Sequence, residues 1–441
     1  MKPAQRGPAL QSVTSWGTGG VNLNDVAAFL IPSLGFFEID LIGKLYSAEI
    51  FFFLLFCFLA PKRAAILKDK WPSRVILFGV LWLVAQIVSD WVNQTEYVDY
   101  ARGLSKIAFI IINFSAIYML INGHERRIFL FGFGAAAGLY LSFVMGSDTF
   151  ASIQDQWKFG SALPLAMIAG LGGSLFSGTS GKRVLGPAVI FFGIGVFSLL
   201  LNFRSFSGIC LMVGAFLLVR KLFLGDGQKR SHRGVKAKLV FAVALAFFVM
   251  AGAGILRVYS DLAQSGLMGQ IAQEKYEDQA AAGGSSLFIS ARFENIIGIS
   301  AIREAPFLGR GSWAKDTQDK LGEILDRLNM AGYDFPDYLY NSPYIPLHSH
   351  IFAAWVEAGI LGAVFWALIL FLIGIAISRL LAESSRLDVY VTFLCFNLGW
   401  DILFSPMAGN RRFMVAFAIV VLILFVEQSR KYMASSQNQL S

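Results

Sequence analysis

The side chains best suited to proton transfer lie together in the C-terminal third of the chain. His348 and His350 are two of only four histidines in 441 residues, and they stand where a polar segment meets an apolar run that begins at Ile351. Histidine titrates nearest to neutral pH, so either ring is a candidate general base. The alternative is that both histidines are polar residues at the membrane interface that end a helix. The pairing of the histidines does not distinguish this alternative from a role as general base.

Three arginines are candidates for binding a phosphate group. Arg204 lies in the short turn 202–205 between two apolar runs, and Arg292 stands at the start of a predicted helix. A helix N-terminus favours anions and a guanidinium offers five donors, so both positions suit a phosphate. Arg303 follows Arg292 at about 16 Å along the helix axis, and we expect it to form a salt bridge within its own segment. Binding to lipid headgroups is the alternative for Arg204.

Carboxylates are too sparse to predict a metal site. Asp334 and Asp337 are spaced as a carboxylate pair, which is a weak signal. If a diphosphate is bound, arginines must neutralise it instead. We therefore expect no metal and no cofactor. Asp401 stands near Arg411 and Arg412 in the sequence and is expected to pair with one of them.

The composition places these residues in a membrane protein. Hydrophobic residues make up 56% of the chain and charged residues 15%, and the mean hydropathy is +0.60. Soluble globular proteins carry about 25% charged residues. We predict an all-α polytopic membrane protein with about twelve transmembrane helices. The expected spans are 24–42, 46–60, 75–92, 104–122, 127–146, 161–177, 184–201, 206–224, 236–256, 349–377, 388–404 and 411–427.

The positively charged residues predict the orientation of these helices. Every connection expected on the cytoplasmic side carries at least two Lys or Arg residues, so the positive-inside rule puts both termini in the cytoplasm. The net charge of +8 is therefore an orientation signal, and the densest basic run, 220–238, joins two predicted membrane helices. This position argues against nucleic-acid binding and favours contact with anionic lipid headgroups. Residues 1–22 are polar, so the first apolar run is expected to be a retained helix.

One connection is much longer than the others. Residues 257–347 form a polar segment on the predicted outer face, and this segment is too long for a simple turn. The spacing of its apolar residues predicts helices near 293–301 and 321–328, with a turn at 306–311 between them. We therefore expect a small helical cap over the bundle. The predicted division is transmembrane helices one to nine (1–256), a periplasmic helical cap (257–347) and helices ten to twelve (348–441).

The order and spacing of these motifs resemble the bacterial O-antigen ligase and O-antigen (exopolysaccharide) polymerase superfamily of integral membrane glycosyltransferases. The resemblance rests on His348-Ser349, nine residues and Gly359-Ile360-Leu361-Gly362, on Ala291-Arg292-Phe293 followed by 306–311, and on the arginine turn near residue 204. The resemblance in sequence covers roughly 185–365. In the rest of the chain only the layout of the predicted helices is similar. Two local departures are the turn itself, which differs from the commoner Ser-Arg-Gly form, and the extra histidine, His350.

The resemblance implies an enzyme of the bacterial inner membrane with its active site facing the periplasm. Such an enzyme moves a glycan from undecaprenyl diphosphate to a sugar hydroxyl by metal-independent, inverting transfer. In this chain Arg204 and Arg292 would hold the diphosphate, and His348 would activate the acceptor hydroxyl. The implied partners are an undecaprenyl-diphosphate-linked oligosaccharide, an acceptor glycan or glycolipid, the lipid bilayer and a chain-length regulator. The secondary candidate residues are His350, Arg303, Arg310 and Asp401.

The acceptor divides this superfamily into branches that the histidine motif does not separate. A polymerase passes the growing chain to the next lipid-linked repeat unit, a ligase joins it to lipid A core, and a third branch glycosylates proteins. The segments 348–366 and 400–406 resemble polymerases more closely, so polymerisation is the favoured interpretation. A transporter that moves lipid-linked glycans without making bonds is a separate alternative, and the lack of an internal repeat argues against it.

Overall fold

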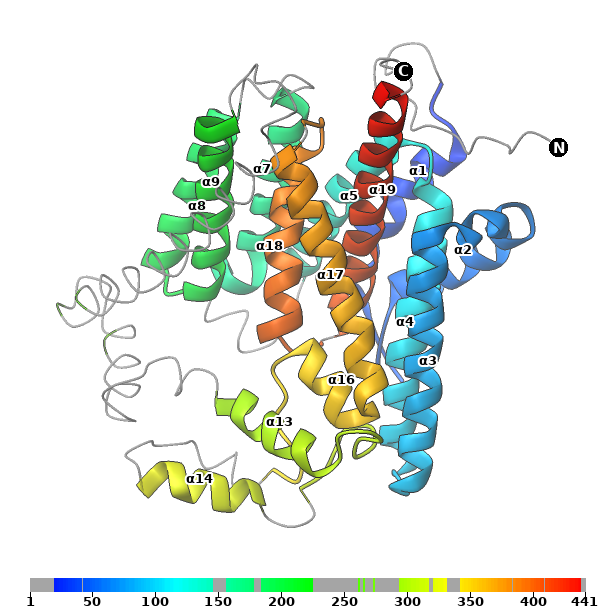
Figure 1. Cartoon of the computed structure of the whole chain (residues 1–441), viewed down its shortest axis with the longest axis vertical. Helices are drawn as coiled ribbons and strands as arrows, with labels where there is room; N and C mark the ends of the chain where they lie inside the picture. The colour runs from blue at the N-terminus through cyan, green and yellow to red at the C-terminus, as the bar shows by residue number, and fades with distance from the viewer. Residues whose placement is uncertain are drawn as a thin grey trace.

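The described part of this computed structural model is helical apart from one short β-hairpin. It comprises Asp261, Ser265, Gln273 and residues 20–41, 43–145, 156–177, 184–224, 293–316, 320–330, 342–382, 384–407 and 409–437. Helices suit an apolar chain because a helix satisfies its backbone hydrogen bonds internally and so tolerates a lipid environment. Most of the helices form one bundle, and a smaller group of helices lies at one end of it (Figure 1).

Six helices in the described residues are long and apolar enough to cross a membrane. They are α2 with the 3₁₀ turn η2 (Ser47–Lys68), α3 (Lys70–Val92), α4 (Tyr97–Ile121), α5 (Glu125–Val144), the π-helical turn η3 with α7 (Trp157–Ser177) and α17 (Ile360–Ala382). The other helices of the bundle are α1 (Leu23–Ser33), α8 (Leu185–Leu200), α9 (Arg204–Leu224), α18 (Asp388–Phe404) and α19 (Arg412–Gln437). The prediction of a polytopic all-α membrane protein is confirmed at this coarser level. The predicted span 236–256 lies outside the described residues.

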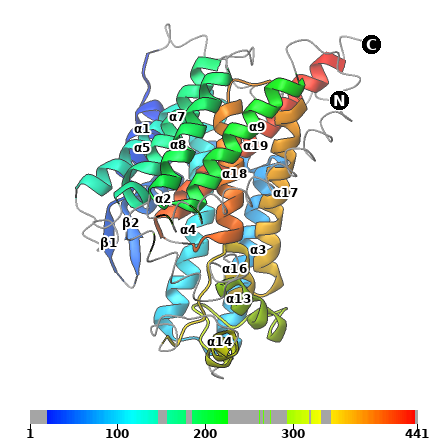
Figure 2. The same cartoon turned by 90° about the vertical axis from the view of Figure 1, so that its left-hand side faces the viewer.

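α18 occupies a central place in the bundle. It packs against α7, α9, α17 and α19, and against a short helix, α16 (His350–Ala358). Figures 1 and 2 show α18 among these helices, with α16 near the end at which α18 stops. Segments from distant parts of the sequence therefore meet around the C-terminal end of α18.

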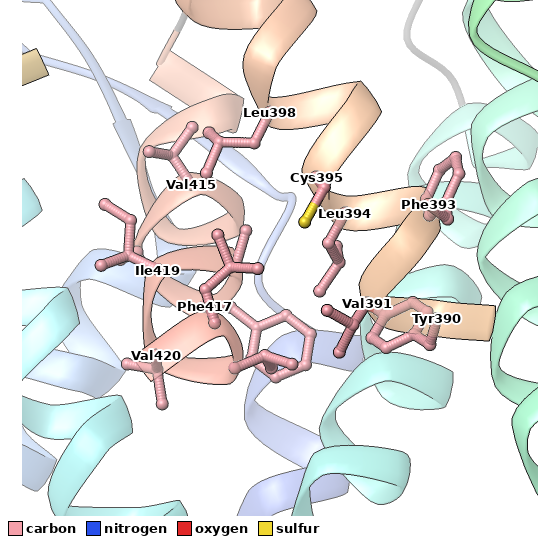
Figure 3. Packing of buried hydrophobic residues seen from close by; sticks show 14 of the residues in the cluster. Tyr390, Val391, Phe393, Leu394, Cys395, Leu398, Val415, Phe417, Ile419 and Val420 are labelled. Carbon is pink, nitrogen blue, oxygen red and sulfur yellow. The ribbon is translucent and has the colours of Figure 1, made fainter. Parts of the chain in front are cut away.

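The contact between α18 and α19 is formed by closely packed apolar side chains. Leu394 and Leu398 of α18 and Phe417 of α19 are buried and lie between the two helices (Figure 3). Phe417 also stacks on Phe131 of α5, with ring centroids 4.2 Å apart. Lipid tails are as apolar as these side chains, so close packing rather than water exclusion holds such helices together.

Buried ion pairs join helices that are distant in sequence. Arg127 lies 2.9 Å from Asp25, which ties α5 to α1. Arg220 lies 2.7 Å from Asp388, which ties α9 to α18. A charge inside a membrane protein is costly unless it is paired, so these contacts favour one arrangement of the helices.

The first predicted span is wrong over its second half. α1 ends at Ser33, and the chain then forms an antiparallel hairpin of β1 (Glu38–Asp40) and β2 (Lys44–Tyr46). The carboxylate of Glu38 accepts hydrogen bonds from Lys44 at 2.6 Å and from Tyr46 at 2.7 Å. These polar partners, together with Gly35 at the turn after α1, favour a hairpin over a continued helix.

The helices predicted within 257–347 are present as α13 (Phe293–Glu304) and α14 (Lys320–Met330). Asp316 accepts a hydrogen bond from the Leu321 backbone and so caps α14. A separate hydrophobic cluster joins these two helices to α16. Its buried members are Ile297, Ala301, Ile302, Ala314, Leu321, Leu325, Ile345 and Val356.

The predicted span 349–377 is two helices rather than one. Gly359 has φ of 69° and ψ of −162° and separates α16 from α17. Only glycine readily adopts this conformation, so the chain turns sharply here. α17 alone is a candidate span, and α16, with His350 at its start, lies outside it.

Candidate functional site

His348 lies on the surface immediately before α16. Its side chain is 46% exposed, and its Nδ1 atom lies 3.5 Å from the Glu294 carboxylate of α13. The exposed ring is accessible from outside, and the Glu294 carboxylate lies beside it. The position therefore meets one requirement of a general base, which is access to the acceptor.

His350 is in the opposite environment. Its side chain is 1% exposed and its ring lies 4.9 Å from the ring of Trp366 on α17. Within the described residues neither ring nitrogen makes a hydrogen bond of good geometry. Burial lowers the pKa of the His350 imidazole and the positive charge of Arg411 lowers it further, although the Pro406 backbone has the opposite effect. His350 is therefore a neutral packing residue in this arrangement.

Ser349, between the two histidines, fixes the start of α16. Its Oγ atom accepts a hydrogen bond from the Phe352 backbone at 3.3 Å, which caps the helix. The same hydroxyl donates to the Ile402 carbonyl of α18 at 2.9 Å. Ser349 thereby attaches the histidine segment to the C-terminal end of α18, where Asp401 lies.

The glycine motifs form a close contact behind α16, which we call the glycine clasp: Gly309 and Gly311 before it, and Gly359 after it. The backbone of Gly311 donates to the Glu357 carbonyl at 3.1 Å. A Cβ atom on Gly359 would lie 2.0 Å from the Phe307 carbonyl oxygen, and one on Gly309 would lie 2.6 Å from the Glu357 oxygen. All three glycines have positive φ. Glycines are therefore required on both sides of α16, because a side chain would prevent the two backbone segments from approaching this closely.

A buried polar network holds this clasp against α3 and α4. Asp90 accepts from the Ser312 hydroxyl at 2.8 Å, and Gln86 donates to the same hydroxyl at 2.9 Å. Lys106 of α4 forms an ion pair with Glu357 of α16. Lys106, Gln86 and Asp90 are not detectable from the sequence, because no local pattern in α3 or α4 indicates that these helices meet Ser312 and Glu357, some two hundred residues later.

A cavity of about 240 Å³ lies beside the end of α18. It is lined by α7 with its π-turn, α9, α18 and α19, and most of its walls are apolar or aromatic. Leu398 and Val415, seen near one end of the packed helices in Figure 3, form part of its wall. A largely apolar cavity with few polar groups is typical of a binding site for a small or amphiphilic molecule.

The charged side chains that line this cavity come from three different elements. Lys158 belongs to the π-turn η3, Asp401 to α18, and Arg411 to the 3₁₀ turn η6 (Gly409–Arg411) before α19. Arg411 Nη1 lies 2.8 Å from Asp401, and Asn397 donates to the other oxygen of that carboxylate at 3.3 Å. The cavity therefore carries two cations and one carboxylate in an apolar surrounding. Sequence reasoning identified Asp401 but missed Lys158 as a candidate.

Of the two predicted diphosphate ligands, Arg204 and Arg292, the structure describes only Arg204. Arg204 is the first residue of α9, and its Nε lies 3.4 Å from the Asn202 side chain. Its neighbours Phe203 and Ser205 line the cavity, so the predicted arginine turn lies at the cavity. Arg292, the second predicted ligand, lies outside the described residues.

The secondary candidates in the cap lie away from the cavity lining. Arg303 is exposed on α13. Arg310 forms an ion pair with Glu304, and its backbone donates to the Val356 carbonyl at 2.7 Å. Arg310 therefore has a structural contact in the clasp.

Asp401 pairs with Arg411, one of the two arginines expected for it.

Among the described residues, no group of three or more His, Cys, Asp or Glu side chains is placed to hold a metal ion. The expectation of metal-independent chemistry remains a prediction. The chain was also compared with known proteins: no family model matches it, and no curated protein matches it significantly.

Proposed function

We propose that the protein is a membrane glycosyltransferase that moves a glycan from undecaprenyl diphosphate to a sugar hydroxyl, and that it polymerises O-antigen or exopolysaccharide repeat units. The observation that carries this proposal is the arrangement at the end of α18. An apolar cavity with Lys158 and Arg411 lies on one side of that end, and the segment bearing the exposed His348 is attached to it through Ser349. A lipid-linked diphosphate needs apolar walls, cations and a base within one region.

The proposed step is a direct displacement at the anomeric carbon. His348 takes the proton of the acceptor hydroxyl, and that oxygen forms the new glycosidic bond. The bond from the anomeric carbon to the diphosphate oxygen breaks, and the diphosphate leaves with the electron pair, so the configuration inverts. Arg204 and Arg292 stabilise the charge that develops on the leaving group, and Glu294, 3.5 Å from His348 Nδ1, orients the ring.

The proposed orientation follows from the basic residues. With twelve spans and both termini in the cytoplasm, residues 257–347 form a cap on the outer face of the bacterial inner membrane. The cavity, the histidine segment and the cap then share the periplasmic side, where lipid-linked glycans are joined. Support for this arrangement comes from the helices α13, α14 and α16, which pack together at one end of the bundle.

The test is elongation by purified protein in detergent. Synthetic undecaprenyl-diphosphate-linked repeat units are added, and the glycans are separated on a gel. A polymerase lengthens the glycans with this substrate alone, whereas a ligase transfers them only after lipid A core is added. A transporter gives neither product, because it makes no bond and needs a sealed bilayer. The proposal is wrong if no product forms in either reaction with folded protein.

A further inference from the structure

Two aromatic side chains form an exposed platform near the segment that leads to His348. The side chain of Trp313 is 46% exposed, and its ring meets the ring of Tyr344 in a T-shaped contact with centroids 6.0 Å apart. We call these two residues the aromatic platform. We propose that the platform binds a sugar ring of the acceptor glycan, at a distance from the hydroxyl that reacts. This inference rests on the proposed function and assigns residues that the sequence motifs leave out.

The backbone of Trp313 has a conformation that bulky residues rarely adopt. Its φ is 54°, in the left-handed region that favours glycine. Its backbone amide donates to the Glu357 carboxylate at 3.4 Å, and the next carbonyl, that of Ala314, accepts from the Ile345 amide at 2.9 Å. These contacts hold the residue in place. Large side chains in such strained conformations are common at ligand-binding positions, where the side chain outweighs the cost of the backbone.

Charged side chains surround the platform. The guanidinium carbon of Arg102 on α4 lies 5.9 Å from the ring centroid of Trp313. Lys315 Nζ lies 5.8 Å from the ring centroid of Tyr344, and it pairs with the Glu96 carboxylate at 2.6 Å. The C–H face of a pyranose ring is apolar and packs on an aromatic face, whereas its hydroxyls need donors and acceptors at the rim. The aromatic platform and its charged neighbours supply both kinds of contact.

The chain between the platform and His348 places both on one face. This segment begins in an antiparallel β-bridge and ends in extended backbone. Ile345 is buried and Leu347 packs against the hydrophobic cluster of the cap, whereas Tyr344 and Pro346 are half-buried and His348 is exposed. Alternate side chains of an extended segment share a face. Four residues span at most about 14 Å, so an oligosaccharide can contact the platform while its end lies at His348.

The alternative for an exposed tryptophan is an anchor at the membrane interface. Trp91, 80% exposed at the end of α3, is typical of such an anchor. Trp313 differs from it, because charged side chains flank its ring and because its turn is hydrogen-bonded to the approach to His348. The acceptor is favoured over the donor glycan, since His348 takes the proton of the acceptor hydroxyl in the proposed step.

The first test measures glycan binding without turnover. The probe is a purified repeat-unit oligosaccharide, released by mild acid from the surface polysaccharide of the bacterium that makes this protein, and calorimetry in detergent gives the dissociation constant. Trp313→Gly removes the ring and accepts φ of 54°. It should keep its thermal unfolding midpoint and bind about 3- to 10-fold more weakly, as expected for the loss of one ring contact. Trp313→Phe keeps an aromatic face and should bind within about 2-fold of the unmodified protein.

The matched control is Trp91→Ala, which removes an exposed tryptophan outside the platform. Its dissociation constant should equal that of the unmodified protein. Tyr344→Leu tests the platform independently, because it leaves the Trp313 backbone unaltered, and it should also weaken binding. The inference is wrong if Trp313→Gly and Tyr344→Leu bind the oligosaccharide as the control does, if Trp91→Ala loses affinity equally, or if the unmodified protein does not bind the oligosaccharide.

Elongation separates the acceptor from the donor glycan. A free oligosaccharide labelled at its reducing end offers a hydroxyl but carries no diphosphate, so it serves only as an acceptor. In Trp313→Gly the KM for this labelled acceptor should rise about 3- to 10-fold, while kcat and the KM for the lipid-linked donor stay unchanged. A rise in the donor KM instead would place the donor glycan on the platform and overturn the inference.

The two proposals fail in different ways. Unmodified protein that lengthens glycans, together with normal oligosaccharide binding by Trp313→Gly and Tyr344→Leu, removes this inference and keeps the proposed function. Oligosaccharide binding that depends on Trp313, in a protein that forms no glycosidic bond, keeps the platform as a glycan-binding site and removes the proposed function.

Discussion

His348 and His350 are two residues apart, yet their side chains meet different surroundings. The ring of His348 is 46% exposed and faces Glu294, whereas that of His350 is 1% exposed and packs on Trp366. Ser349 produces this division, because its capping position turns the chain from an extended approach into α16. The geometry favours His348 as the base and gives His350 a packing role.

His350 predicts a dependence of stability on pH. Burial lowers the pKa of its imidazole, and Arg411 and Lys106 add to this effect. The unfolded chain therefore takes up a proton near pH 6.5 that the folded protein excludes, so stability is lost as the pH falls below about 6.5. We expect the midpoint temperature of thermal unfolding in detergent to decrease when the pH is lowered from about 7.5 to about 5.5. The decrease should be smaller in His350→Met. Equal pH dependence in both proteins would contradict the buried neutral ring.

The charges at the cavity predict activity without a divalent metal. Lys158 and Arg411 supply positive charge there, so a diphosphate has partners in the protein itself. Elongation by purified protein should continue in excess EDTA at an unchanged rate. A loss of product that a divalent ion restores would contradict this prediction.

Sequence reasoning reaches some of the site residues and misses others for physical reasons. Asp401 is detectable because a carboxylate near the end of an apolar run needs a partner, and Arg411 is close by in the chain. Lys158 is not detectable in this way, since a lysine beside an apolar run is also typical of an interface. Its place in the cavity depends on the packing of α7 against α18, which no local pattern encodes.

The glycine clasp connects the cap to the bundle. Gly309, Gly311 and Gly359 allow two backbone segments to approach closely, and the Asp90–Ser312 and Lys106–Glu357 contacts fix them against α3 and α4. The clasp therefore positions α16 and, through it, the histidine segment. It also explains why glycines occur both before and after the histidines.

The clasp predicts a specific sensitivity to added side chains. In Gly359→Ala the new Cβ would lie 2.0 Å from the Phe307 carbonyl oxygen, and φ is 69°. The backbone conformation alone costs about 1–3 kcal/mol for a residue other than glycine. We expect a lower midpoint of thermal unfolding and loss of elongation.

The matched control is Gly374→Ala in α17, where an added Cβ has nothing within 4 Å. Alanine in a helix interior is favoured over glycine by about 0.5–1 kcal/mol, so this variant should be at least as stable as the unmodified protein. Equal stability of the two variants would show that the clasp is unimportant.

Helix positions follow from the sequence more closely than helix ends do. The apolar runs near 75–92 and 388–404 correspond to α3 and α18, because apolar composition alone requires a helix in lipid. The run 24–42 misleads, since its last residues are apolar enough for a span but pair as a hairpin through Glu38 and Lys44. The break at Gly359 depends on a tertiary contact and was likewise missed.

The proposed orientation in the membrane predicts which residues face the outside. Lys44 in the hairpin and Lys68 at the end of η2 flank one candidate span, Ser47–Lys68. In a Cys57→Ser background, an impermeant maleimide should label Lys44→Cys in intact spheroplasts and Lys68→Cys only after the membrane is broken. Labelling of Lys68→Cys in intact spheroplasts would reverse the orientation and place the cavity on the cytoplasmic side.

The role of His348 as general base is tested by the elongation rate of His348→Ala, measured beside that of the unmodified protein. Both are purified in detergent, shown to share the same thermal unfolding midpoint, and supplied with undecaprenyl-diphosphate-linked repeat units. A general base contributes about 10²–10⁴ in rate, so the unmodified protein should lengthen glycans and His348→Ala should lose at least about 100-fold. Equal rates in the two proteins would show that His348 is not the general base, and an unmodified protein that makes no product would overturn the proposed function.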